Sequence, residues 1–232
     1  MSKSTEAGRE FVQYALSIGA LELLPNGRPL KNGRISPYFF NSGLFNTGQS
    51  IGHLAQAYAA AIIEADDEEH DPPEVIYGPP YKGIPLAVMV AAVLSGQGER
   101  YQGMAWAFSR KETKDHGEGG LLVGAELEEQ RVVIVDDVMT DGATKGEAVK
   151  FIEEQGGFPI ACVIAFDRQE RGKDENDPRA AAQVFAEKYG IPVLAAATLD
   201  DLIQVLEEGP AVPLGAKTLP LILKYRDQYG VK

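Results

Sequence analysis

The stretch RVVIVDDVMTDGATKGEA, residues 131–148, decides the fold of this chain. It opens with a continuous β-branched apolar run at 132–135, which is typical of a strand buried on both faces of a parallel sheet. The run stops at two carboxylates, Asp136 and Asp137, and a polar loop then leads into a helical pattern that ends at two glycines, residues 156–157. The stretch therefore predicts a buried strand, a short loop and a helix.

This strand–loop–helix unit has the parts needed to hold a sugar phosphate. The loop N–H groups and the helix N-terminus can bind a phosphate dianion, and the two carboxylates can accept hydrogen bonds from ribose hydroxyls. An ordinary small-residue turn before a helix has the same architecture. The pattern by itself therefore leaves phosphate binding and a plain structural turn both open.

Composition bounds the class of protein. The chain has 232 residues, of which 44% are hydrophobic, and this excludes a disordered protein. Its one cysteine, Cys162, excludes a disulfide framework within the chain and falls in a predicted buried strand, so we expect it in the core. The formal net charge of −12 argues against nucleic acid as a partner, and a polyanionic substrate would need a locally basic site.

No targeting or membrane signal stands out in the sequence. Residues 1–11 carry no apolar signal-peptide core, and the most apolar stretch, residues 84–94, is too short to span a bilayer. We therefore expect a cytoplasmic protein without a membrane partner.

The rest of the chain alternates predicted strands with predicted helices. Strands are predicted at 74–77, 104–108, 159–166 and 191–196, and helices at 4–18, 50–64, 83–94, 178–189, from 198 onward and at 217–229. The alternation predicts an α/β fold with a Rossmann-like parallel sheet flanked by helices. Residues 20–47 instead carry turn signals at 25–27 and 31–34, which predict a small β-rich hood. We expect an N-terminal helix and hood over 1–47 and a core domain over 48–232.

Each conspicuous polar motif directly follows a predicted strand. These motifs are residues 78–82, 109–120, 136–144 and 167–171. The carboxyl ends of parallel strands gather at one edge of a sheet, where ligands usually bind. The convergence of the motifs predicts an enzyme.

The motif at 109–120 is basic and rich in glycine. Arg110, Lys111, Lys114 and His116 lie close together in it. A solvated charged loop has the same composition. On an acidic protein, however, a basic loop can also gather an anion such as pyrophosphate.

Several segments, in order along the chain, resemble the orotate phosphoribosyltransferases, a branch of the type I phosphoribosyltransferase family. The pattern of two aspartates and TxGAT at 132–144 resembles the family's phosphoribosyl pyrophosphate signature, and FSRKETKDHGEGG at 108–120 resembles its catalytic loop RKxxKxHGxGG. GPPYKGIP at 78–85 resembles its pyrophosphate loop. LKNGRISPYFFNSGLF at 30–45 and FDRQERG at 166–172 resemble its orotate-binding segments. The resemblance implies the type I phosphoribosyltransferase fold.

The resemblance also implies a role for each matching residue. Those implied to bind orotate are Lys31, Phe39, Phe40, Thr140 and Arg168. Those implied to bind phosphoribosyl pyrophosphate are Tyr81, Lys82, Arg110, Lys111, Lys114, His116, Asp136, Asp137, Val138, Met139, Thr140, Asp141, Gly142, Ala143 and Thr144. Among them Lys114, His116, Asp136 and Asp137 are the implied catalytic residues. Because Phe39 and Phe40 are adjacent in a predicted strand, one should pack inward and the other face a ligand, although the pattern also allows both in the core.

The implied reaction joins orotate to phosphoribosyl pyrophosphate and gives orotidine 5′-monophosphate and pyrophosphate, a step of pyrimidine (UMP) biosynthesis. The resemblance further implies Mg²⁺ held mainly through substrate and water, with no direct protein ligand, and a homodimer with shared active sites. It also implies a cis peptide bond between Pro80 and Tyr81.

One departure and two alternatives qualify the resemblance. The family's phosphate loop usually reads TAGTA, whereas this chain has TDGAT: Ala143 replaces a threonine, Thr144 offers a hydroxyl one position later, and Asp141 must point to solvent. A purine-specific phosphoribosyltransferase would share the central motif but lack the Phe39–Phe40 pair, Arg168 and the basic loop. A non-catalytic regulator would have lost basic loop residues, and this chain has all of them.

Overall fold

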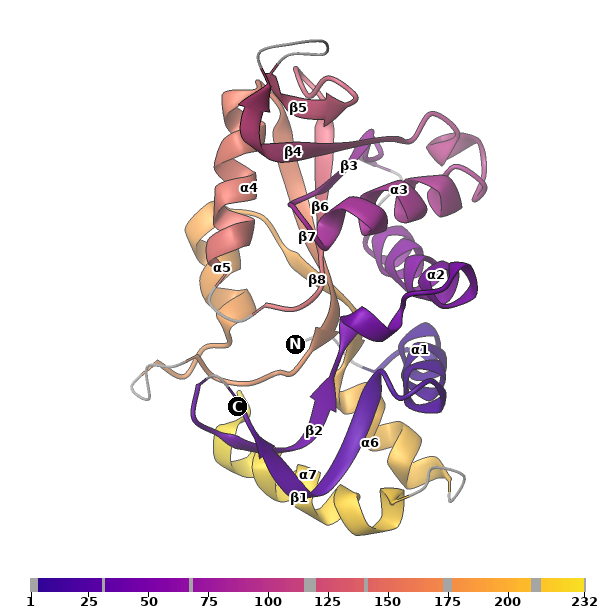
Figure 1. Ribbon diagram of the computed structural model, residues 1–232, viewed down its shortest axis with the longest axis vertical. Helices are drawn as coiled ribbons and strands as arrows, with labels where there is room; N and C mark the ends of the chain where they lie inside the picture. The colour runs from indigo at the N-terminus through magenta and orange to yellow at the C-terminus, as the bar shows by residue number, and fades with distance from the viewer. Residues whose placement is uncertain are drawn as a thin grey trace.

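The computed structural model describes residues 4–30, 32–66, 69–114, 120–139, 142–172, 177–209 and 214–231, with backbone alone at 113 and 114. Within these residues a six-stranded sheet has the strand order β5-β4-β3-β6-β7-β8 (Figure 1). The strands are β3 Val75–Gly78, β4 Ala105–Lys114, β5 Gly120–Gly124, β6 Arg131–Asp136, β7 Phe158–Asp167 and β8 Val193–Thr198. Neighbouring strands are parallel except β4 and β5. The predicted α/β fold is confirmed.

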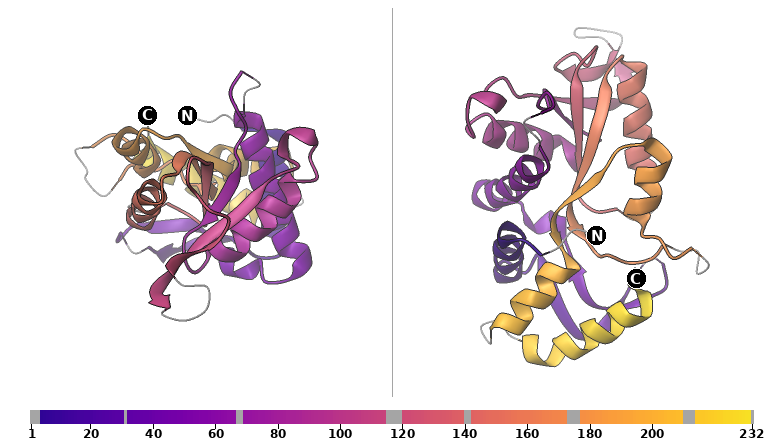
Figure 2. Two further views of the ribbon diagram at one scale, coloured as in Figure 1. Left: turned by 90° about the horizontal axis from the view of Figure 1, so that it is seen from above. Right: turned by 180° about the vertical axis from the view of Figure 1, so that it is seen from behind.

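Helices cover both faces of this sheet, as the views from the front and from behind show (Figures 1 and 2). One face carries α1 Glu6–Ser17, α2 Gly48–Ala65 and α3 Gly83–Leu94, and the other carries α4 Ala143–Glu154 and α5 Ala181–Tyr189. In β6, Val133 and Val135 belong to the first apolar cluster, while Val132 and Ile134 belong to the second. The strand is therefore buried on both faces, as its continuous apolar run predicts. Cys162 is buried in the second cluster, where burial raises the pKa of its thiol to about 12.

A two-stranded hairpin, β1 Leu21–Pro29 and β2 Ile35–Phe40, forms the predicted hood. Its turn falls at the second predicted signal, where the N–H of Leu30 donates to the carbonyl of Arg34 at 2.8 Å. The turn predicted at 25–27 is wrong: those residues lie inside β1, where the register shifts between Leu23 and Arg28. An irregularity in the pairing, between the Leu23–Tyr38 and Arg28–Ser36 pairs, accommodates the turn-forming residues without ending the strand.

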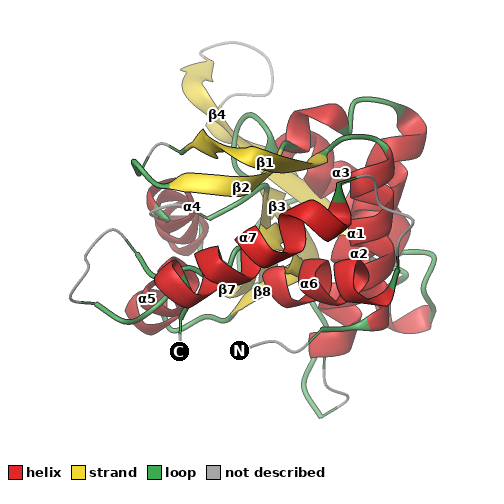
Figure 3. Cartoon of the chain, turned by 90° about the horizontal axis from the view of Figure 1, so that it is seen from below, coloured by secondary structure: helices red, strands yellow, loops and turns green. Residues whose placement is uncertain are grey.

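The C-terminal helices close the hairpin side of the molecule. These are α6 Leu199–Glu208 and α7 Gly215–Tyr229, and two 3₁₀ turns lie elsewhere, at Ser42–Leu44 and Glu99–Tyr101. Helix α7 lies between the β1–β2 hairpin and α6, in contact with all three elements (Figure 3). In the described part of the chain, no helix is long and apolar enough to cross a membrane.

The basic motif at 109–120 departs from its predicted loop structure. Strand β4 continues to Lys114 and β5 begins at Gly120, so most of the motif is an antiparallel hairpin in which these two residues pair. The hairpin reaches beyond the rest of the sheet in the view from above (Figure 2). The charged residues 109–114 show no apolar alternation, which is why the strand was not evident from the pattern.

Helix α6 begins where a helix is predicted from residue 198 onward, and Thr198 and Asp201 form a capping box there. The Asp201 carboxylate accepts from the N–H and the hydroxyl of Thr198, both at 2.7 Å, and the N–H of Asp201 donates to the Thr198 hydroxyl at 3.2 Å. The second oxygen of the Asp201 carboxylate accepts from the N–H of Thr5, the N-cap of α1, at 2.9 Å. One buried carboxylate therefore joins the N-termini of two helices.

Replacing Asp201 with alanine should destabilise the fold by about 2–4 kcal/mol, because a cap is lost and buried donors are left unpaired. Urea unfolding followed by circular dichroism measures the change. Asp227→Ala, at an exposed aspartate of α7, is the matched control and should have little effect. Equal effects of the two substitutions would contradict the role given to Asp201.

Candidate active site

Asp136 ends strand β6 and is held by a buried lysine. Its side chain accepts from Lys145 Nζ at 2.6 Å and from the N–H of Asp137 at 2.9 Å. Lys145 lies in the first turn of α4, is only 4% exposed and also donates to the carbonyl of Val138 at 2.7 Å. Tyr58 of α2 donates its hydroxyl to the Asp136 carbonyl at 2.6 Å. Lys145 therefore ties the end of β6 to the start of α4 across the loop between them.

Asp137 is paired with a second lysine, at the surface. Its carboxylate accepts from Lys82 Nζ at 2.6 Å, from the Ser42 hydroxyl at 3.1 Å and from the N–H of Val138 at 2.8 Å. Burial raises the pKa of Asp137, but the Lys82 and Val138 hydrogen bonds outweigh burial and the net pKa is lowered. The stabilisation of the folded chain by the charged Asp137 carboxylate is therefore present at neutral pH, and it is lost as the pH falls through the lowered pKa.

The loop after this acidic pair ends at the N-terminus of α4. Gly142 is the N-cap and has a φ of +74°, the left-handed conformation that favours glycine. Ala143 and Thr144 follow as exposed first residues of the helix, while Val138 and Met139 pack against the two apolar clusters. The helix N-terminus predicted for phosphate is thus in place. Thr140 and Asp141 lie outside the described residues.

The segment after β3 contacts the basic hairpin through Tyr81. The Pro80–Tyr81 peptide bond is cis, as the resemblance implies. Tyr81 is 68% exposed, and Lys111 Nζ lies 4.6 Å from the centre of its ring. Arg110 donates to the carbonyl of Gly120 across the hairpin at 3.2 Å. Lys111 of the hairpin thus meets the end of the β3 segment. The side chain of Lys114 and all of His116 lie outside the described part.

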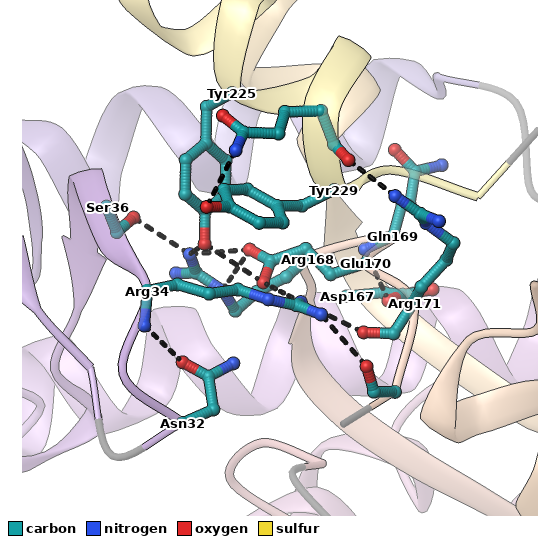
Figure 4. Close-up of polar contacts among 12 residues, drawn as sticks. Asn32, Arg34, Ser36, Asp167, Arg168, Gln169, Glu170, Arg171, Tyr225 and Tyr229 are labelled. Carbon is teal, nitrogen blue, oxygen red and sulfur yellow. Dashed lines mark hydrogen bonds and ion pairs between the residues drawn. The ribbon is translucent and has the colours of Figure 1, made fainter. Parts of the chain in front are cut away.

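The loop after β7 holds the predicted arginine in a polar cluster with the hood (Figure 4). Arg168 donates from Nε to Glu170 at 2.7 Å and from Nη2 to the Ser36 hydroxyl at 2.8 Å. Its guanidinium lies 4.2 Å from the centre of the Tyr38 ring. Burial lowers the pKa of Arg168, but its interactions with the Tyr38 and Tyr225 hydroxyls and with the Glu170 carboxylate outweigh burial, and the net pKa is raised.

Glu170 is the centre of this cluster. Besides Arg168, it accepts from Arg34 Nη1 at 3.2 Å, from the Tyr38 hydroxyl at 3.3 Å and from the Tyr225 hydroxyl at 3.1 Å. Burial raises the pKa of Tyr38 well above its ordinary value and that of Tyr225 to about 12. Both hydroxyls are therefore protonated at neutral pH and donate to the carboxylate.

The two adjacent aromatic residues of β2 face opposite ways, as one of the two interpretations expects. Phe40 is 8% exposed and stacks on Phe166, with ring centroids 5.8 Å apart. Phe39 is half-buried, and the Arg28 guanidinium lies 4.0 Å from the centre of its ring. Phe39 is thus the member of the pair outside the core. Lys31 lies outside the described residues.

Sequence reasoning missed the partners that hold these residues: Ser36, Tyr38, Ser42, Lys145, Glu170 and Tyr225. A signal for Lys145 was present, because it shares a helical spacing with the buried residues Ala148, Val149 and Ile152 of α4. A lysine on the apolar face of a helix needs a buried partner. Glu170 lies two residues after Arg168, in the same loop, but nothing in that segment marks it as the partner. The remaining partners come from distant segments and carry no local signal.

Comparison with known proteins shows which family the chain resembles in sequence and structure. The sequence model of the phosphoribosyl transferase domain matches residues 45–192. The orotate phosphoribosyltransferase of Bordetella avium is 45% identical over 224 residues, which are 96% of this chain and 97% of that protein. Orotate phosphoribosyltransferase 2 of Saccharomyces cerevisiae is 41% identical over 236 residues, covering 100% of both chains. The crystal structure of the orotate phosphoribosyltransferase of Francisella tularensis matches with a TM-score of 0.79 and 33% identity, over 95% of this chain and 99% of that one.

The chain therefore belongs to the phosphoribosyltransferase family, in the branch formed by the orotate phosphoribosyltransferases.

The two lysine–aspartate pairs should differ sharply in their effect on stability. Lys145→Met leaves the Asp136 charge buried without its partner and should cost about 3–5 kcal/mol. Lys82→Met removes a lysine that is 64% exposed from the Asp137 pair and should cost below about 1 kcal/mol. Guanidinium unfolding of the two variants checks the contrast. Similar losses would show that burial does not distinguish the pairs.

Proposed function

We propose that this chain transfers the phosphoribosyl group of phosphoribosyl pyrophosphate to orotate, giving orotidine 5′-monophosphate and pyrophosphate in pyrimidine biosynthesis. The observation that carries the proposal is that three motifs stand at the carboxyl ends of adjacent parallel strands, Lys82 after β3, the acidic pair at the end of β6 and Arg168 after β7, and that Lys82 contacts Asp137. The full-length relatives named for this activity support it.

The phosphoribosyl pyrophosphate would lie along β6 and β3. We assign its 5′-phosphate to the loop from Val138 to Thr144 and the N-terminus of α4, and its ribose hydroxyls to Asp136 and Asp137. The diphosphate would meet Tyr81 and a basic set made of Lys82, Arg110, Lys111, Lys114 and His116. Lys82 already contacts Asp137, so a single lysine can join the ribose and diphosphate subsites.

Orotate would lie between the hood and the loop after β7. We assign its recognition to Lys31, Phe39, Thr140 and Arg168, with Phe40 supporting the site from the core, where it stacks on Phe166. The two arginines and one carboxylate of the Arg34–Arg168–Glu170 cluster leave one positive charge unmatched, which a monoanionic pyrimidine carboxylate would balance. This local charge favours orotate over a purine base.

The reaction asks the protein for positioning and charge stabilisation. As the bond between the ribose C1 and the diphosphate oxygen breaks, the ribose becomes oxocarbenium-like and the orotate nitrogen attacks its opposite face. Lys114 and the other basic residues would stabilise the departing pyrophosphate. Closure of the basic hairpin would exclude water, which would otherwise capture the cation.

Magnesium fits this site as a companion of the substrate. Among the residues that the structure describes, no group of three or more His, Cys, Asp or Glu side chains is placed to hold a metal ion. Asp136 and Asp137 are each paired with a lysine, so Mg²⁺ would be held by the diphosphate, ribose hydroxyls and water. When bound, it would supply positive charge to the leaving diphosphate.

A spectroscopic assay of orotate consumption, with phosphoribosyl pyrophosphate and Mg²⁺, tests the activity. Arg168→Ala should weaken orotate binding by about 1.5–3 kcal/mol, because it removes a charge-assisted partner of the base. The KM for phosphoribosyl pyrophosphate should hardly change. Equal weakening of both substrates would count against the assignment of Arg168, and no orotate consumption by the unaltered chain would end the proposal itself.

We also propose a homodimer in which the basic hairpin completes the partner's site. Between Ser109 and Gly120 the motif carries no apolar side chain to anchor it on its own domain, and the hairpin reaches beyond the sheet (Figure 2). A neighbouring subunit related by two-fold symmetry could place it over the diphosphate.

Mixing two inactive variants tests this sharing. If the hairpin acts in trans, a heterodimer of Lys114→Ala and Asp137→Asn has one site with both lesions and one with neither. Random exchange of equal amounts should then restore about a quarter of the unaltered activity. If the hairpin acts in cis, every site keeps a lesion. An inactive mixture, with subunit exchange confirmed by mass spectrometry, refutes the shared site.

A further inference from the structure

The C-terminal helix reaches the arginine of the proposed base site through one hydroxyl. Tyr225 of α7 is 5% exposed, and its hydroxyl donates to Glu170 at 3.1 Å. The same hydroxyl accepts from Arg168 Nη2 at 3.5 Å, and the guanidinium lies 5.9 Å from the centre of the Tyr225 ring. Figure 4 shows Tyr225 descending from α7 onto the arginine and the glutamate together. Tyr225 therefore touches both members of the pair.

The backbone after α7 fastens the same loop. The N–H of Val231 donates to the carbonyl of Gln169 at 3.0 Å, and the N–H of Arg171 donates to the carbonyl of Tyr229 at 2.9 Å. Glu170 also forms an antiparallel bridge with Gly230. The C-terminal segment thus contacts Gln169, Glu170 and Arg171 in succession.

The loop needs such support because its backbone is strained. Gln169 has a φ of +51°, a left-handed conformation that is costly for a residue other than glycine. Its buried side chain exchanges two hydrogen bonds with Asp200 at the start of α6, at 3.0 and 3.1 Å. The conformation that aims Arg168 is therefore imposed by α6 and α7, from outside the loop.

We propose that Tyr225 is a positioning residue for base recognition: it fixes Glu170 and, through it, the orientation in which Arg168 meets orotate. The inference rests on the proposed function, because it requires Arg168 to contact the base. It extends the site to α7, which lies beyond the matched domain at residues 45–192. Loss of the Tyr225 hydroxyl would let the Arg168 side chain adopt other rotamers. Binding of the base would then weaken, while the phosphoribosyl pyrophosphate subsite stays intact.

Two tyrosines one turn apart on α7 give a matched pair of variants. Tyr225→Phe removes only the hydroxyl that contacts Glu170 and Arg168. Tyr229→Phe removes a hydroxyl whose described contact is with the Gln228 side chain, at 3.0 Å. Tyr225→Phe should raise the KM for orotate roughly tenfold, about 1.4 kcal/mol, with the KM for phosphoribosyl pyrophosphate unchanged. Tyr229→Phe should leave both constants near those of the unaltered chain.

A second variant and a melting curve separate positioning from general weakening. Glu170→Gln removes the charge that holds Arg168. It should raise the KM for orotate in the same selective way, because the lost orientation of Arg168 outweighs the positive charge that the substitution adds. A selective rise in the KM for orotate in both variants supports the inference, provided that their melting temperatures lie well above the assay temperature. An unchanged KM for orotate in Tyr225→Phe, or an equal rise for both substrates, overturns it. If the unaltered chain consumes no orotate, the proposed function fails first, so the two failures are distinguishable.

Discussion

The common direction of β3, β6 and β7 is the constraint on which the site depends. These three strands are adjacent and parallel, with Tyr77 opposite Ile134 and Asp136 opposite Ile164, so the chain leaves all three at one edge. Segments separated by tens of residues in sequence are then forced together. The 2.6 Å contact between Lys82 and Asp137 is the direct consequence, because each residue follows the end of its own strand. The sheet thus brings the charges together, and the loops only adjust them.

The charges at this edge are balanced in two different ways. Lys145 and Asp136 form a buried pair, and removing either partner would leave the charge of the other buried and unpaired. Lys82 and Asp137 form an outer pair in which the lysine is largely in water, so a ligand anion can compete for it at little cost. The inner pair therefore links the end of β6 to the start of α4, whereas in the outer pair Lys82 stays accessible from solvent. This division explains how a chain of net charge −12 can present cations to a polyanion.

Much of the fold and part of the site could be predicted from the sequence, for a local reason. Buried strands such as β6 and capping boxes such as Thr198–Asp201 depend on residues close together in the sequence, so a short sequence pattern predicts them. The end of β4 was not visible, because its charged residues are held by pairing with β5 and not by burial of their own side chains. The Pro25-Asn26-Gly27 signal did not end the strand, because an irregularity in the β1–β2 pairing accommodates these residues within β1. Glu170 and Tyr225 escaped notice because their contact spans 55 positions of sequence and neither residue is unusual in its own segment.

The two halves of the site differ in the same way: one is built from consecutive residues, and the other from segments far apart in the sequence. The acidic pair, its loop and the N-terminus of α4 lie inside residues 45–192, the part of the chain that matches the domain shared by the family. The arginine cluster instead draws Arg34 and Tyr38 from the hood and Tyr225 from α7, on either side of that domain. Because α7 packs on both strands of the hairpin, these two additions support each other as well as the loop between them. On the proposed assignment of the site, the shared domain supplies the ribose and phosphate subsites, and the segments at its two ends contribute to recognition of the base.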